Sequence, residues 1–180
     1  GNVGKVLDVL KAEGATGAFF ILGNLPEKQP ELVRRMAAEG HLVCNHTFTH
    51  KNLCGAPAGA LTAELTRLEE ACGTVGVAVA KYYRPPEGRF SEENLKFASD
   101  AGYKTVFWSF GYVDWDNERQ MSPEDALQKI LNGLHNGEVL LLHPTSSTNA
   151  AIMKQLITEL KARGYRFETL DELCASTPIT

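Results

Sequence analysis

The chain has 180 residues, which fits one domain of ordinary size, because two separate cores would each hold too little apolar surface to fold. Hydrophobic residues make up 43% of it and charged residues 22%, which excludes disorder as its main description. The 18 Lys and Arg against 22 Asp and Glu give a net charge of −4, the wrong sign for a nucleic-acid-binding protein. The longest apolar stretches are far shorter than the ~20 residues that cross a bilayer, so we expect no membrane-spanning segment. We predict a single domain over residues 1–180 that acts as a monomer.

Segments with helical spacing of apolar residues alternate along the chain with short apolar runs that are typical of strands. In chain order we predict a helix over residues 1–13, a strand over 18–22, a helix over 30–39, a strand over 42–45, a helix over 59–72 and a strand over 82–84. There follow a helix from 91 to 101, a strand over 104–109, a helix that opens at 122, a strand over 139–142, a helix over 148–163 and a last strand over 166–168. Such alternation predicts an α/β fold with a mostly parallel sheet or barrel, whose functional groups gather at the carboxyl ends of strands.

The four cysteines are Cys44, Cys54, Cys72 and Cys174, and none of them belongs to a C-x-x-C motif. A redox pair or a zinc knuckle is therefore not indicated. We expect buried free thiols rather than disulfides, because a domain of this size needs no covalent cross-link.

Four predicted strand exits carry unusual polar and aromatic residues, namely residues 45–50, 84–88, 111–116 and 142–144. In a parallel sheet these exits would lie on one rim. His46 and His50 are four residues apart, a spacing that lets two imidazoles converge on one cation. By itself this pair is more often coincidence than a metal site, but its position after a strand favours the metal site.

Three further residues at these exits have residue types suited to catalysis. Arg84 stands between a strand and two prolines, so we expect it to hold a carboxylate rather than to lie in solvent. Asp114 either shapes its loop or orients a histidine, and the sequence leaves both readings open. His143 follows the apolar Leu140-Leu141-Leu142 and could act as acid or base. His41 and His135 are predicted to be structural.

At these exits the chain closely resembles the polysaccharide deacetylases of carbohydrate esterase family 4, whose ordered motifs include H-[ST]-x-x-H, R-x-P-x-G, D-x-W-like and L-x-H segments. The flanking text, such as Arg84-Pro85-Pro86-Glu87-Gly88, Asp114-Trp115 and Leu141-Leu142-His143, is similar to that of the delta-lactam-forming muramic acid de-N-acetylases of spore-forming bacteria. The resemblance runs from about Lys5 to Leu173 and implies a distorted, incomplete parallel (β/α) barrel.

The resemblance implies roles for the histidines and their neighbours. His46 and His50 would bind a divalent metal ion, for which zinc fits best, with cobalt or another transition metal as the alternative, and the metal would activate water for attack on an acetamide carbonyl. His143 would protonate the departing amine. Arg84 would orient the catalytic base, and Asp114 would support His143.

The resemblance also implies residues that contact the substrate. The backbone N–H of Glu87, in the loop that includes Gly88, would stabilise the oxyanion. Tyr112 and Trp115 would offer flat faces to a sugar ring, and Leu142 would line the substrate site. The Glu87 carboxylate departs from relatives, so we hypothesise that it disfavours strongly anionic glycans.

One family motif, Thr-Phe-Asp-Asp-Gly, does not occur in the sequence. In the family it lies on the first strand and supplies the base and the third protein ligand to the metal. We therefore expect the family's first strand to be missing from this chain, which would be an N-terminally incomplete fragment of a longer catalytic domain.

The leading functional hypothesis is metal-dependent removal of acetyl groups from peptidoglycan, most of all from muramic acid on the route to delta-lactam, outside the cytoplasm in the cell envelope or as a secreted protein. A non-catalytic glycan-binding pseudoenzyme is the first alternative, since the base motif is absent from the sequence. A deacetylase of chitin oligomers or of another small N-acetylated compound is the second.

Overall fold

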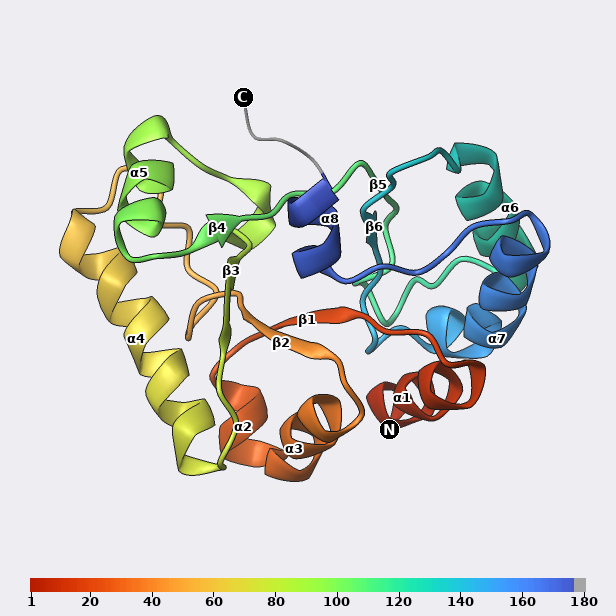
Figure 1. The fold of residues 1–180 in the computed structure, drawn as a ribbon, viewed down its shortest axis with the longest axis horizontal. Coiled ribbons are helices and arrows are strands. Elements are labelled where there is room, and N and C mark those ends of the chain that lie inside the picture. The colour runs from red at the N-terminus through yellow and green to blue at the C-terminus, as the bar shows by residue number, and fades with distance from the viewer. Residues whose placement is uncertain (177–180) are drawn as a thin grey trace. The chain divides into compact units, whose positions relative to one another are not determined.

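The computed structural model describes residues 1–176, so the last four residues of the predicted domain lie outside the described part. Helices and short strands alternate along the chain (Figure 1). The helices are α1 (Asn2–Glu13), α2 (Asn24–Lys28), α3 (Pro30–Ala38), α4 (Ala58–Thr74), η1 (Pro86–Gly88), α5 (Glu92–Asp100), α6 (Pro123–Gly133), α7 (Ser147–Ala162) and α8 (Leu170–Ser176). The strands are β1 (Ala18–Ile21), β2 (Leu42–Asn45), β3 (Ala80–Tyr83), β4 (Lys104–Thr105), β5 (Phe110–Gly111) and β6 (Leu140–Leu141). None of the described helices is both long and apolar enough to cross a membrane.

The chain divides into two compact units, which we describe separately. Unit 2 is the continuous segment Gly17–Phe107. Unit 1 combines residues 1–16 with the chain from Trp108 onward. Unit 1 is therefore built from both ends of the sequence.

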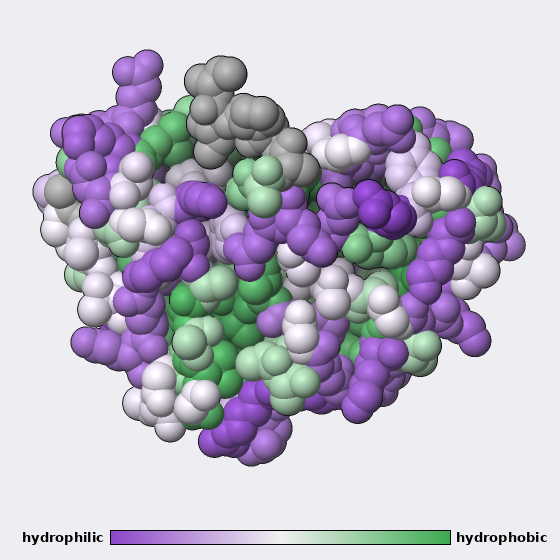
Figure 2. All heavy atoms as spheres, viewed as in Figure 1, coloured by the Kyte–Doolittle hydropathy of each residue, from purple (hydrophilic) through white to green (hydrophobic). Residues whose placement is uncertain are grey.

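Unit 2 contains a four-stranded parallel sheet in the order β1-β2-β3-β4. Ile21, Asn45 and Tyr83 are neighbours in register at the carboxyl ends of the first three strands. The loops that follow β2 and β3 therefore leave the sheet at the same edge. A core cluster from α4, α5 and the adjoining strand and loop residues packs beside the sheet; its buried members are Leu53, Leu61, Leu65, Tyr83, Ala98 and Tyr103. Three of the four β1 residues are only partly buried, and Figure 2 shows hydrophobic atoms exposed over the strand region of this unit.

Unit 1 contains the parallel pair β5-β6, in which Gly111 lies opposite Leu141. Helix α6 contacts β5, residues of α6 and α7 form the core cluster against which Phe110 and Leu140 of this pair pack, and α1 packs against α7. Serines cap both longer helices of the C-terminal segment, because Ser122 accepts a hydrogen bond from Asp125 N and Ser146 accepts one from Asn149 N. The loops after β5 and β6 leave this small sheet at one edge, as the loops after β2 and β3 do in unit 2.

The prediction of an α/β fold with parallel strands is confirmed. All four cysteines are free thiols, but the prediction that they are buried holds for Cys44 and Cys72 only, because Cys54 and Cys174 are partly exposed. The predicted strand over residues 104–109 is wrong in extent. It stops at Thr105, and the carbonyls of Val106 and Phe107 instead accept hydrogen bonds from the Arg84 guanidinium.

The predicted strand over residues 166–168 is wrong. This segment has no regular structure and leads into α8, which the sequence analysis missed together with α2. Thr169 and Glu172 form a reciprocal capping box at the start of α8, since Thr169 N donates to the Glu172 carboxylate and Glu172 N donates to Thr169 Oγ1. The T-x-x-E spacing was the available signal for this helix.

Candidate active site

The two predicted metal ligands lie together in the loop that follows β2. The ring centroids of His46 and His50 are 4.9 Å apart, with the planes inclined by 70°. His46 Nδ1 lies 2.7 Å from the carbonyl oxygen of Arg84. Because a carbonyl only accepts, His46 donates from Nδ1, and a neutral ring then presents the lone pair of Nε2. A metal-binding histidine is commonly held in this way by its other nitrogen.

The backbone of this loop is tightly curled. Thr47 and His50 adopt left-handed conformations, with φ of 69° and 60°. Two polar side chains hold the curl: Asn45 Oδ1 accepts from Thr47 N at 2.9 Å, and Thr47 Oγ1 accepts from His50 N at 3.0 Å. The strained turn therefore has hydrogen-bond partners that compensate for its conformation.

Helix α4 holds the same loop through Glu64, a residue that the sequence analysis did not single out. Its Oε2 accepts hydrogen bonds from Phe48 N at 3.0 Å, from Thr49 N at 2.7 Å and from Thr49 Oγ1 at 2.9 Å. The Arg67 guanidinium lies 3.7 Å from the centre of the Phe48 ring. Two residues of α4 thus contact the segment between the histidines.

The two imidazoles of this loop could supply some, but not all, of the ligands that a transition-metal ion needs. Two imidazoles converge, one of them with its tautomer set by a carbonyl, and the His50 side chain is exposed. Within residues 1–176 no cluster of three or more His, Cys, Asp or Glu side chains could hold a metal ion. The residues present therefore fit two positions of a metal site.

The loop after β3 fixes Arg84 in a buried position. Its Nε donates to the Val106 carbonyl at 3.2 Å, its Nη2 donates to the Phe107 carbonyl at 3.1 Å, and its guanidinium lies 4.1 Å from the centre of the Phe20 ring. Burial lowers the pKa of Arg84 to about 10, which leaves it protonated at neutral pH. The structure shows a guanidinium held by two backbone carbonyls and an aromatic ring. That Arg84 orients a carboxylate stays a prediction.

Glu87 lies at the tip of the same loop in a left-handed conformation, with φ of 58°. Its exposed carboxylate pairs with Arg89 Nε at 3.0 Å, so the negative charge that we expected to repel anionic glycans is partly offset. Gly88 N already donates to the Pro85 carbonyl at 3.0 Å. Of the two residues predicted to contact the oxyanion, Glu87 is therefore the better candidate for the N–H donor, because the N–H of Gly88 already has an acceptor.

In unit 1 the loops after β5 and β6 bring Asp114 and His143 into direct contact. His143 Nδ1 lies 2.6 Å from Asp114 Oδ1, and the backbone N of His143 donates to Asp114 Oδ2 at 2.7 Å. Asp114 is 1% exposed, whereas the His143 side chain is 38% exposed. Of the two sequence readings of Asp114, the one in which it orients a histidine agrees with this geometry. The arrangement directs Nε2 of His143 away from its carboxylate partner.

Tyr112 does not offer the sugar-stacking face that we expected from the sequence. It is buried in the core cluster of unit 1, and its hydroxyl donates to Asn149 Oδ1 at 2.5 Å. Burial, and secondarily the charge of Asp114, raise the pKa of Tyr112 to about 12. Buried and exposed residues alternate along residues 112–115, which follow β5, and Tyr112 is one of the buried ones.

Trp115 and Leu142 differ in accessibility. Trp115 is 58% exposed and its ring centre lies 6.1 Å from that of His143, so it stays a candidate sugar platform. Leu142 is partly buried and packs against the core cluster of unit 1. That Leu142 lines the substrate site therefore stays a prediction.

The two histidines predicted to be structural lie outside these clusters. His41 is buried, accepts a hydrogen bond from Gly17 N at 3.2 Å and packs against Phe19. Burial lowers the pKa of His41, which favours its neutral form. His135 contacts the Gly133 carbonyl and Ser109 Oγ, both at 2.9 Å.

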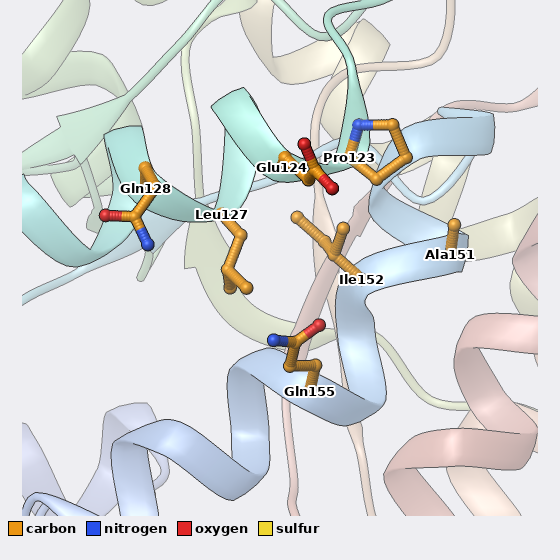
Figure 3. A pocket seen from close by; sticks show the side chains of 7 residues that line it. All are labelled: Pro123, Glu124, Leu127, Gln128, Ala151, Ile152 and Gln155. Atoms are coloured by element: carbon orange, nitrogen blue, oxygen red, sulfur yellow. The ribbon is translucent and has the colours of Figure 1, made fainter.

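A pocket of about 280 Å³ lies between α6 and α7 in unit 1 (Figure 3). It is lined by Pro123, Glu124, Leu127, Gln128, Ala151, Ile152 and Gln155. None of the predicted site residues lines it, so we do not assign this pocket to the candidate site.

The structure thus assembles two clusters, one in each unit. Unit 2 brings together His46, His50 and Arg84, and unit 1 brings together Asp114 and His143. Sequence reasoning missed Glu64 and Asn149, which bind the two clusters from neighbouring helices. Neither residue has a motif of its own, and both contacts depend on how the helices pack.

Comparison with known proteins identifies the family to which this chain belongs. Residues 1–106 match the family model of polysaccharide deacetylases. The chain is 41% identical over 174 residues to the peptidoglycan-N-acetylmuramic acid deacetylase PdaA of Bacillus subtilis, a match that covers 96% of this chain and 66% of the relative. It is 34% identical to a chitooligosaccharide deacetylase of Rhizobium leguminosarum, with coverage of 97% and 77%. The chain belongs to the polysaccharide deacetylase family.

The structural comparison agrees with the sequence comparison. The structure of Bacillus subtilis PdaA, described as a family 4 carbohydrate esterase, matches with a TM-score of 0.91 and 40% identity, covering 96% of this chain and 74% of that one. A family 4 pseudoenzyme from Bacillus anthracis matches with a TM-score of 0.86 and 25% identity, covering 96% and 60%. These likenesses confirm the predicted polysaccharide deacetylase fold. The chain spans about two thirds or less of the length of the first curated relatives that it matches.

Proposed function

We propose that this chain is the catalytic part of a metal-dependent deacetylase that removes acetyl groups from muramic acid in peptidoglycan. The observation that carries the proposal is the Asp114–His143 pair, in which a buried carboxylate holds Nδ1 of a partly exposed imidazole. A histidine held in this way is suited to donate and accept protons at Nε2. The similarity to the muramic acid deacetylase of Bacillus subtilis supports the choice of substrate.

His46 and His50 would hold the metal ion, and the imidazole donors favour zinc, with cobalt as the alternative. When bound, the metal would supply Lewis-acid activation of water and of the acetamide carbonyl. The Arg84 carbonyl and the Glu64 carboxylate keep the histidine loop in its curled form. Arg84 itself would orient the base of the reaction.

His143 would deliver a proton from Nε2 to the departing amine, while Asp114 stabilises the imidazolium at Nδ1. The Glu87 N–H would donate to the oxygen on which negative charge develops, a contact typically worth about 3 kcal/mol. Trp115 would pack against the sugar ring beside His143. These assignments are supported by the positions of Glu87, Trp115 and His143, which follow β3, β5 and β6 in the chain.

The substrate implies a location and a pathway position. Peptidoglycan lies outside the cytoplasmic membrane, so the protein would act in the cell envelope or as a secreted enzyme. Removal of the acetyl group from muramic acid frees the amine that delta-lactam formation requires. We therefore propose a role in cell-wall modification during sporulation.

The test is acetate release, measured with added zinc or cobalt from glycans that carry N-acetylmuramic acid and, separately, from chitin oligomers. The 180-residue chain is assayed alone and with an N-terminal extension that carries the family's Thr-Phe-Asp-Asp-Gly strand. We expect the extended protein to release acetate from muramic acid, and His143→Ala to slow release by ~10²–10⁴-fold. Release from chitin oligomers alone would favour the chitooligosaccharide alternative.

Absence of release from every glycan, with glycan binding retained, would instead establish a non-catalytic binding module. This alternative is worth testing because a family 4 pseudoenzyme shares the fold.

A further inference from the structure

The hydrogen bonds behind Asp114 support a further inference, which rests on the proposed function of His143. Asn149, on the first turn of α7, is fully buried. Its Nδ2 donates to Asp114 Oδ2 at 2.6 Å and to the His143 carbonyl at 3.1 Å, and its Oδ1 accepts from the Tyr112 hydroxyl. One amide thus contacts both members of the Asp114–His143 pair.

The contacts define the orientation of this amide. With the amide turned over, Oδ1 of Asn149 would face the Asp114 carboxylate at hydrogen-bond distance, and two acceptors would oppose each other. The Tyr112 hydroxyl then supplies the donor that the Oδ1 end needs. The Asp114 carboxylate and the His143 carbonyl only accept, so they select the orientation that directs the NH₂ group toward them, and the Tyr112 hydroxyl stabilises it by donating to Oδ1.

Both oxygens of the Asp114 carboxylate have hydrogen-bond partners. Oδ2 accepts from Asn149 Nδ2 and from His143 N, which leaves Oδ1 directed at His143 Nδ1. Without the Asn149 contact, Oδ2 would lose one of its two donors and the carboxylate could rotate about its terminal bond. Such rotation would weaken the contact that keeps the proton on Nδ1.

The same turn of α7 is anchored to the Asp114 loop by a second route. Ser146 Oγ accepts from Asn149 N at 3.0 Å and also donates to Gln120 Oε1. Gln120 Nε2 donates to the carbonyl of Asp114 at 3.0 Å and to that of Asp116 at 2.7 Å. Asn149 is therefore held at both its backbone and its side chain relative to the loop that it supports.

We propose that Asn149, supported at Oδ1 by the Tyr112 hydroxyl, is the positioning residue that fixes the Asp114 carboxylate, so that neutral His143 carries its proton on Nδ1 and presents Nε2 for proton transfer. Asn149 acts through Asp114 and touches no substrate.

The test reads the tautomer of His143 directly, by nitrogen-15 NMR of the histidine rings in the 180-residue chain without metal or substrate. The His143 signals are assigned by their loss in His143→Ala. We expect the Nδ1–H tautomer to dominate in the unaltered chain. In Asn149→Ala the ratio of Nδ1–H to Nε2–H should fall roughly fivefold, the change that corresponds to one net hydrogen bond.

Two further variants separate positioning from general loss of stability. Tyr112→Phe keeps the aromatic ring in the core and removes only the hydroxyl, so it should shift the tautomer ratio in the same direction by a smaller factor. Thr148→Val removes a neighbouring hydrogen bond, from Thr148 Oγ1 to the Met121 carbonyl at 2.7 Å, and should leave the tautomer ratio unchanged. If Asn149→Ala does not fold, Tyr112→Phe carries the test.

An unchanged tautomer ratio in the folded Asn149→Ala and Tyr112→Phe variants would overturn the proposal, and so would an equal shift in Thr148→Val. Because the readout needs neither metal nor turnover, a failed deacetylase assay leaves it intact. In the active extended protein, Asn149→Ala should lower kcat about tenfold with little change in KM, well short of the ~10²–10⁴-fold effect of removing the acid itself.

Discussion

His46 and His143 are both held at Nδ1, but by acceptors of different charge. The acceptor for His46 is the neutral carbonyl of Arg84, and the acceptor for His143 is the carboxylate of Asp114. A neutral acceptor sets the tautomer without favouring the imidazolium, which suits a metal ligand. A carboxylate stabilises the imidazolium, which suits an acid that must hold a proton before transferring it. The difference is consistent with the two different roles that we propose for these histidines.

Substitution of each histidine should separate these two roles. His46→Ala should abolish retention of zinc or cobalt, because it removes one of two imidazole donors in the loop. His143→Ala should leave metal retention unchanged and slow turnover. Metal content after gel filtration and acetate release measure the two effects, and equal metal loss in both variants would show that the acid is misassigned.

Gly133, the last residue of α6, has no room for a side chain. A Cβ atom there would lie 2.2 Å from Cε2 of Phe110, a ring that packs against the core of unit 1. We expect Gly133→Ala to destabilise the protein by about 1–3 kcal/mol in urea unfolding, because the ring must shift within a packed core. The matched control is Gly4→Ala in α1, where a Cβ would meet nothing within 4 Å.

Gly4→Ala should stabilise the protein by about 0.5–1 kcal/mol through helix propensity. Equal effects of the two substitutions would contradict the role assigned to Phe110.

At the level of helices and strands, the regular pattern was predictable and the irregular parts were not. Helical spacing and caps located α1, α3, α4, α5, α6 and α7 within a few residues, because each buries one apolar stripe. The strand over residues 104–109 was overestimated, because the sequence does not reveal that a distant guanidinium takes the carbonyls after Thr105. Short elements such as α2 bury too few residues to produce a readable period.

The motif residues of the candidate site could be predicted from the sequence. The residues that hold them in position through hydrogen bonds could not. His46, His50, Asp114 and His143 stand at strand exits, and the structure joins them in pairs. Glu64 is polar on a helix and looks like any solvated residue in sequence, since its contacts form across 15 residues. Tyr112 was misread because an aromatic residue beside an acid can face either the rim or the core.

Helix α4 should influence metal binding through Glu64. Glu64→Gln removes the charge of the group that accepts three hydrogen bonds from the histidine loop. We expect zinc affinity to fall about tenfold, the lower end of the effect seen for residues that support metal ligands. Isothermal titration with zinc measures the change, and Glu70→Gln on an exposed position of the same helix is the control. Unchanged affinity in Glu64→Gln would show that the loop holds its conformation without this carboxylate.

On the scale of the whole molecule, buried weak acids should make the fold sensitive to alkaline pH. Burial raises the pKa of the Cys72 thiol to about 11, and that of Tyr112 is raised to about 12. The unfolded chain loses these protons at lower pH than the folded chain does. The stability that they contribute is therefore complete below pH ~8.5 and decreases as pH rises.

We expect the free energy of unfolding to fall by on the order of 1 kcal/mol from Cys72 alone between pH 8 and pH 10. Urea denaturation under reducing conditions at the two pH values measures the change. Cys72→Ala lowers stability at both values by leaving a cavity, but its pH dependence should be shallower than that of the unaltered chain. An identical slope would show that Cys72 does not titrate differently in the two states.

Unit 1 draws its first helix from the start of the chain and everything else from residue 108 onward, whereas unit 2 is continuous. During synthesis on the ribosome, residues 17–107 emerge as a complete set and can begin to fold, while α1 must wait for its partner α7, which is made more than a hundred residues later. The nascent polypeptide therefore carries α1 with its apolar stripe exposed until α7 has been made, which makes that helix a natural contact for chaperones.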